Sequence, residues 1–112
     1  MGKLILSGLP ASGGIIIGNL RAIVDPSDAD KIDEKCIIVV ESTNPQIAHV
    51  IIKYALAIVT EKGGILSHAA ILARELGIPC VVQVPNALTH LKNYKLIQVD
   101  GDHGTISVQS FD

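Results

Sequence analysis

Short runs of aliphatic and β-branched residues, each followed by a turn signal, constrain the fold of this chain more than any other feature. In the centre, an apolar run at 36–41 is followed by amphipathic residues 45–55 and a second apolar run at 57–60. Continuous apolar runs of this length are typical of strands covered on both faces. An alanine-rich segment at 68–76 and a third run at 80–84 complete a strand–helix–strand–helix–strand order, which favours parallel pairing.

The two central helices have clear end signals. Asn44 is a good N-cap with Pro45 at the first helical position, and apolar residues then recur at the spacing of one helix face. The second helix is predicted to begin at His68, with Ser67 as its N-cap. Gly77 is expected to end it.

Short apolar runs separated by turn signals predict antiparallel strands in the outer parts of the chain. Residues 24–28 indicate a polar loop and residues 86–91 a short helix. We predict an α/β fold with mixed sheets, in which residues 1–112 form one domain. The remaining strands are expected at 4–6, 15–17, 21–24, 96–99 and 105–108, the last two as a hairpin around a turn at 100–104.

Composition and charge exclude several functional classes. The 112 residues are 48% apolar and 18% charged, which indicates a folded chain with a real core. A net charge of −2 without a basic cluster argues against nucleic acid as a partner. The apolar run at 4–6 is too short for a signal peptide or membrane span, so we expect a cytoplasmic protein that does not bind membranes. Cys36 and Cys80 are expected to be buried, reduced thiols. A metal site would need clustered Cys and His residues, and the sequence has no such cluster.

The segment before the alanine-rich helix carries the candidate chemistry. Gly63 and Gly64 allow a phosphate or another backbone to approach, and His68 follows at a helix start capped by Ser67. Free N–H groups and the helix dipole at that position attract phosphate and disfavour the imidazolium form. A neutral imidazole can attack phosphorus, and small Ala69 leaves room beside it. From these residues alone, a histidine that only caps or packs remains an open alternative.

Residues 63–82 closely resemble the phosphohistidine signature of phosphoenolpyruvate-utilising enzymes, which include pyruvate phosphate dikinase, phosphoenolpyruvate synthase and enzyme I of the sugar phosphotransferase system. Gly8–Ser12 is similar to the opening of the family's domain. Val99–Gly101 with Gly104 is similar to its closing turn. The resemblance covers nearly the whole chain and implies a single swivelling β/β/α domain of three layers.

The resemblance also implies a role for this domain. The motif histidine, here His68, would carry a phosphoryl group between a nucleotide site and a pyruvate or phosphoenolpyruvate site. Those sites would lie on an ATP-grasp-like domain and a barrel domain, in trans or in a parent chain. The family suggests that the ring nitrogen farther from the backbone reacts. Magnesium and ATP are expected on the partner domains, with no cofactor on this domain, so the chain would be a component of a phosphotransferase and not a complete enzyme.

On this interpretation, the phosphate cradle around the histidine would consist of Gly63, Gly64, Ser67 and Ala69. The sequence departs from the family pattern at three positions, none of which removes the nucleophile. Leu66 stands where a Thr is frequent, Gln83 where many members have Gly, and Gly13 where many have Pro. These departures favour the synthase or dikinase branch, or a divergent relative.

Two other functions remain as alternatives. The fold could serve as a binding or regulatory module without phosphotransfer, docking a partner through the surface around the histidine. A self-contained hydrolase using His68 with Ser67 is disfavoured, because no third group is evident to orient the pair.

Other polar residues have less specific signals. His49, His90 and His103 are expected to be exposed and lack metal-ligand spacing. Arg74 lies well around the helix from His68, so a structural or interface role is favoured over direct phosphate contact.

Overall fold

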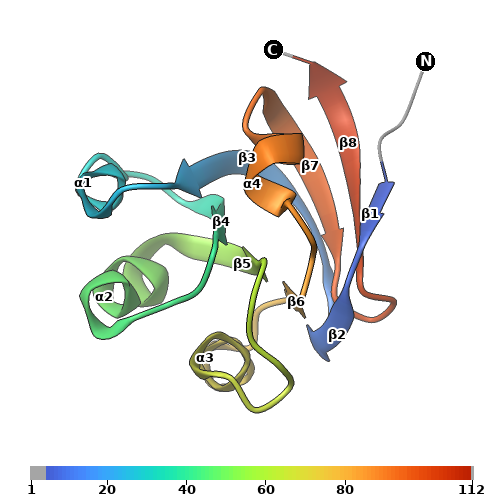
Figure 1. Cartoon of the computed structure of the whole chain (residues 1–112), viewed down its shortest axis with the longest axis horizontal. Helices are drawn as coiled ribbons and strands as arrows, with labels where there is room; N and C mark the ends of the chain where they lie inside the picture. The colour runs from blue at the N-terminus through green and yellow to red at the C-terminus, as the bar shows by residue number, and fades with distance from the viewer. Residues whose placement is uncertain (1–4, 112) are drawn as a thin grey trace.

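A computed structural model describes residues 5–111 of the chain. Over these residues the chain forms eight strands and four helices, whose arrangement Figure 1 shows. In chain order they are β1 (Ile5–Ser7), β2 (Leu9–Ser12), β3 (Ile15–Ile23), α1 (Pro26–Ala29), β4 (Cys36–Val40), α2 (Pro45–Tyr54), β5 (Ala55–Thr60), α3 (His68–Leu76), β6 (Cys80–Val82), α4 (Ala87–Leu91), β7 (Tyr94–Asp100) and β8 (Thr105–Phe111).

The strands form one curled, mixed sheet with the order β1-β8-β7-β3-β4-β5-β6-β2. Strand β3 belongs to both halves: Ile15–Asn19 pair antiparallel with β7, and Leu20–Ile23 pair parallel with β4. The parallel strands β4, β5 and β6 make the central layer, with α1, α2 and α3 on one face and β7, β8 and β1 on the other (Figure 1). This arrangement confirms the predicted α/β fold with mixed sheets in three layers.

Two hydrophobic cores lie on the two faces of the central layer. Ile38 and Ile58 are fully buried against the helices. Ile37 and Val39 are fully buried on the opposite face, against the antiparallel strands and α4. Each such side chain contributes about 1.5–3 kcal/mol through removal from water. Burial on both faces explains why the run at 36–41 is continuously apolar instead of alternating.

The two thiols lie in the core between the central layer and the helices. Cys36 and Cys80 are fully buried, as predicted. Burial raises the pKa of Cys36 to about 11 and that of Cys80 to about 12. Both groups are therefore unreactive thiols in the folded protein.

Two local predictions were wrong, and the sequence analysis missed one strand. Residues 15–17 and 21–24 were expected as separate strands, but β3 is continuous because Gly18 provides close packing instead of a turn. A Cβ on Gly18 would lie 3.0 Å from Leu56 Cδ1. The missed strand is β2, a short edge strand at residues 9–12. The polar loop expected at 24–28 contains the start of α1, where Asp25 and Asp28 form a capping box.

The two glycine motifs near the ends of the chain lie against each other. The Gly8 amide donates to the Gly104 carbonyl at 2.9 Å, and the Gly101 amide donates to the Gly14 carbonyl at 2.7 Å. The Asp102 carboxylate also accepts from the Gly14 amide at 3.1 Å. The turn between β7 and β8 thereby holds the segment that leads into and out of β2.

Gly101→Ala should destabilise the fold more than Gly77→Ala. A Cβ on Gly101 would overlap the Ser12 carbonyl oxygen, with a separation of 2.0 Å, whereas nothing lies within 4 Å of a Cβ on Gly77. We expect a loss of about 3 kcal/mol or more for Gly101→Ala, from overpacking against backbone. Gly77→Ala should cost about 1 kcal/mol, from its left-handed φ alone. Urea unfolding measures both; equal losses would contradict the close packing.

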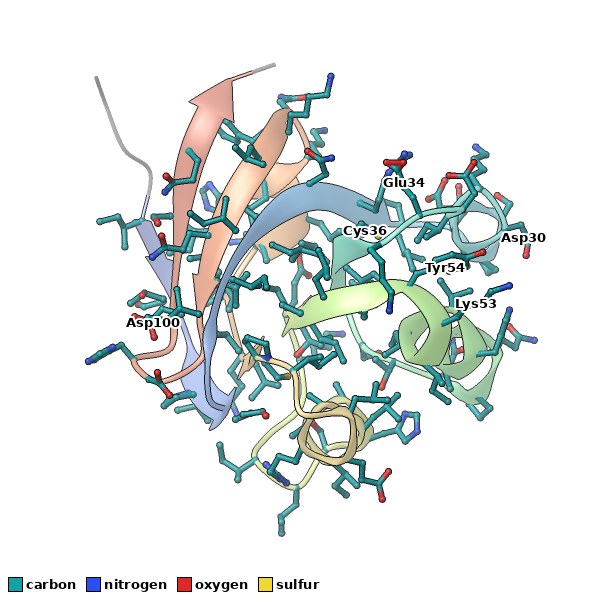
Figure 2. All side chains as sticks on the ribbon, turned by 180° about the vertical axis from the view of Figure 1, so that it is seen from behind. Asp30, Glu34, Cys36, Lys53, Tyr54 and Asp100 are labelled. Carbon is teal, nitrogen blue, oxygen red and sulfur yellow. The ribbon has the colours of Figure 1, made fainter. Side chains whose placement is uncertain are left out.

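The Asp100 carboxylate gives the hairpin a dependence on pH. Figure 2 shows Asp100 beside the β7–β8 turn, on the opposite side of the view from Lys53 and Tyr54. Burial acts to raise the pKa of Asp100, but hydrogen bonds from the His103 amide and ring and from the Asp102 amide outweigh it. The pKa of Asp100 is therefore held below its ordinary value of 3.8.

Because its pKa is lower in the folded state, the ionised Asp100 carboxylate stabilises the fold. Its contribution is complete above the unfolded-state pKa and is lost as the pH falls through the lower folded-state pKa. We expect the free energy of unfolding to fall as the pH decreases below about 4, and to fall less steeply in Asp100→Asn. Urea titrations at several pH values measure the slope. Identical slopes for wild type and variant would show that Asp100 does not contribute.

Candidate functional site

Three loops meet where the parallel strands end. They follow β4, β5 and β6, which are neighbours in the sheet, so their carboxyl ends share one edge. The Lys62 amide donates to the Glu41 carbonyl at 2.9 Å, and their side chains form an exposed ion pair at 3.2 Å. These contacts join the loop after β4 to the loop after β5.

The third loop is joined to the second in a similar way. The Val84 amide donates to the Thr60 carbonyl at 3.0 Å. The Glu61 carboxylate accepts from the Leu88 amide at 2.9 Å, in the first turn of α4. The three loops therefore form one connected surface around the start of α3.

His68 lies exposed on this surface as the first residue of α3. Ser67 is the N-cap, and its hydroxyl accepts from the Ala70 amide at 3.4 Å. At the other end, Gly77 adopts a left-handed conformation and caps the helix. The structure confirms the predicted start and end of this helix.

Two backbone amides at the start of α3 have no hydrogen-bond acceptor among the described residues. Within residues 5–111, no acceptor is found for the His68 and Ala69 amides. The Ile65 carbonyl, four residues before Ala69, accepts instead from the Arg74 guanidinium at 2.7 Å. Two N–H groups without an intrachain acceptor and the positive end of the helix dipole therefore lie at the helix start that carries the imidazole. His68 is exposed there, whereas Ala69 is only 2% exposed and its side chain packs in the core.

The glycine pair shapes the turn before the helix. The Ser67 amide donates to the Gly64 carbonyl at 3.0 Å, which closes a tight turn. Gly63 has φ +99°, and a Cβ there would lie 2.9 Å from Ser67 Cβ. The structure thus brings the four predicted cradle residues, Gly63, Gly64, Ser67 and Ala69, together with His68 at one helix start.

Thr43 is a site residue that the sequence analysis missed. Its hydroxyl lies 3.1 Å from His68 Nδ1, across the gap between the loops after β4 and β5. The two residues are 25 positions apart and approach each other because β4 and β5 are neighbours. A polar residue three positions after a buried strand was the available signal, but it becomes informative only with the strand order.

Arg74 has the structural role that the sequence favoured. Its guanidinium donates to the Ala11 carbonyl at 2.8 Å and to the Ile65 carbonyl at 2.7 Å. It therefore connects α3 with β2 and with the loop that precedes His68.

The other histidines are exposed, as predicted. His49 lies on α2, His90 near the end of α4, and His103 in the β7–β8 turn, where its ring contacts Asp100 at 3.0 Å. Within the described part of the chain, no three His, Cys, Asp or Glu side chains are arranged to hold a metal ion. Over the same residues, no helix has the length and apolar character needed to cross a bilayer.

Comparison with known proteins identifies the family. The family described as "PEP-utilising enzyme, mobile domain" matches residues 32–104, well over half of the chain. The chain belongs to this family of mobile domains.

Relatives of this mobile domain are parts of much longer proteins. Phosphoenolpyruvate synthase from Pyrococcus furiosus is 47% identical over 104 residues, which cover 93% of this chain and 13% of that protein. Rifampicin phosphotransferase from Bacillus subtilis is 39% identical over 101 residues, 90% of this chain and 11% of that protein. A solution structure of Enzyme I matches 75% of this chain and 34% of its own, with a TM-score of 0.62 and 29% identity. In these longer chains, further domains accompany the mobile domain.

Two of the departures from the family pattern lie at this site. Leu66 is 83% exposed, in the turn just before His68. Gln83, where the resemblance predicts a glycine, has φ +56°, a left-handed conformation that glycine adopts more readily. Leu66 is thus exposed two residues before the candidate nucleophile, and the exposed Gln83 side chain lies near Gly64.

Thr43→Val should weaken the orientation of the His68 ring without unfolding the domain. The change removes a hydroxyl at similar volume and leaves Nδ1 without this partner. A hydrogen bond of this kind is worth about 1 kcal/mol, so we expect about a fivefold slower modification of His68 by a small phosphoryl donor. The ¹⁵N shifts of the ring should also move towards a mixture of tautomers. Unchanged shifts and rate would show that Thr43 does not orient the ring.

Proposed function

We propose that this mobile domain is a phosphoryl carrier and that His68 is the group that is phosphorylated. The observation that carries the proposal is the 3.1 Å contact between Thr43 Oγ1 and His68 Nδ1 at an exposed helix start. When Nδ1–H donates to this hydroxyl, the lone pair of the ring is at Nε2, the nitrogen farther from the backbone. An exposed Nε2 is available to a phosphoryl donor that approaches from outside.

The proposed transfer has two steps. His68 Nε2 attacks phosphorus, an N–P bond forms, and the bond from phosphorus to the donor's leaving group breaks with its electron pair on that group. The ring then carries positive charge, which the hydrogen bond from Nδ1–H to Thr43 Oγ1 stabilises. In the second step, an acceptor oxygen attacks phosphorus, and the N–P electron pair returns to Nε2.

The phosphoryl oxygens would be held by the backbone. The free amides of His68 and Ala69 lie at the positive end of the α3 dipole, which favours a group of this charge. Gly63 and Gly64 present no side chains at the beginning of the turn before the helix, and the Ser67 hydroxyl accepts from the Ala70 amide. These features support the cradle composed of Gly63, Gly64, Ser67 and Ala69.

The donor and acceptor sites would lie on other domains. The similarity to a phosphoenolpyruvate synthase supports a nucleotide site that binds ATP with magnesium and a second site for pyruvate or phosphoenolpyruvate. Ile65, Leu66 and Ile71, all within three residues of His68 in the chain, are exposed, as expected for a surface that contacts such sites in turn. The carrier would then be a component of a phosphotransferase in the cytoplasm.

His68→Ala should abolish phosphorylation of the domain. The protein is incubated with phosphoramidate, which releases ammonia when its phosphoryl group is transferred, and the product is followed by ³¹P NMR. Wild type should gain one acid-labile phosphorus–nitrogen signal, and His49→Ala, an exposed control on α2, should gain it equally. Label on His68→Ala equal to that on wild type would overturn the assignment.

Enzymatic transfer tests the carrier role separately. Incubation with Pyrococcus furiosus phosphoenolpyruvate synthase, magnesium and labelled ATP should place label on His68. Absence of label with both donors, together with unchanged partner binding by His68→Asn, would favour a binding module instead.

A further inference from the structure

Gln83 combines an unusual backbone with a free side chain. Its φ of +56° lies in the left-handed region, which is disfavoured for a residue with a long side chain. Within residues 5–111, its exposed amide has no hydrogen-bond partner. Such conformations concentrate at functional sites, where the surrounding structure holds them.

The surrounding contacts fix Gln83 beside the loop that leads to His68. The residue directly follows β6, and the next amide, that of Val84, donates to the Thr60 carbonyl at 3.0 Å. A Cβ built on Gly64 would lie 3.7 Å from Gln83 Nε2, so the amide lies over the open face of this glycine. Gly64 begins the tight turn that ends at Ser67.

The charged side chains of this region have other partners. Lys62 pairs with Glu41, Arg74 donates to two carbonyls, and the Glu61 carboxylate accepts from the Leu88 amide. The Gln83 amide is therefore a neutral donor with unused capacity beside the glycine turn. A glutamine there can donate to an anionic oxygen while it remains neutral. It therefore adds no positive charge that would oppose release of the anion.

We propose that Gln83 is a phosphoryl-binding residue, whose side-chain amide donates to a phosphoryl oxygen when the group is transferred to His68. This inference rests on the proposed carrier function and adds a side-chain donor to the backbone cradle. Gln83 makes and breaks no covalent bond. The N–P bond forms at His68, and the Gln83 N–H only stabilises the charged phosphoryl oxygen during transfer.

Substitutions that change the amide but keep its length test the proposal. Gln83→Met removes the donor without adding charge, and Gln83→Glu replaces it with a group that repels phosphate. We expect phosphorylation by phosphoramidate to slow about fivefold for Gln83→Met and more than tenfold for Gln83→Glu. Gln109→Met and Gln109→Glu, at an exposed position of β8, are the matched controls and should react at the wild-type rate.

Two further measurements separate phosphoryl binding from a structural role. Thermal unfolding shows whether each variant is folded, and Gln83→Gly, which removes the amide donor and tolerates the left-handed backbone, replaces any variant that is not. The ³¹P shift of phosphohistidine should differ between wild type and Gln83→Met but not between wild type and Gln109→Met.

The outcomes distinguish this inference from the carrier proposal. If wild type is phosphorylated and the phosphorylation rates of Gln83→Met and Gln83→Glu lie within twofold of its rate, Gln83 has no phosphoryl-binding role. The carrier function is not contradicted by that result. Wild type that takes up no label from phosphoramidate or from the enzymatic donor would overturn both. Slower labelling in the predicted order at unchanged stability would establish the inference.

Discussion

The hydrogen bonding among three parallel strands positions every group at the site. Because β4, β5 and β6 are neighbours and are buried on both faces, their ends cannot shift independently. The loop after β4 supplies Thr43, the loop after β5 supplies His68, and the loop after β6 supplies Gln83. A 3.1 Å contact between side chains 25 residues apart depends on this shared strand register.

Features governed by local rules could be predicted from the sequence, and features governed by strand order could not. Ser67 and Gly77 are local cap signals, so the bounds of α3 followed directly. Thr43 has no local feature that associates it with a histidine in another loop. Gly18 illustrates the opposite error: its local signal suggests a turn, but packing against Leu56 places it inside a strand.

Most polar side chains around His68 bind other parts of the same chain. Arg74 holds β2 and the preceding loop, while Glu61 caps α4. Among residues 5–111, no partner is found for His68 Nε2, the His68 and Ala69 amides and the Gln83 side-chain amide. A surface with so few donors suits a group that is bound briefly and passed on, because tight binding would oppose its release.

The buried thiols have a practical consequence for labelling the domain. Cys36 and Cys80 are the only cysteines in the sequence, and both are inaccessible and weakly acidic in the folded state. A cysteine introduced on the outer face of α2 would therefore be the sole site that couples to a maleimide dye or spin label. Docking of a partner near such a probe could then be followed without first removing Cys36 or Cys80.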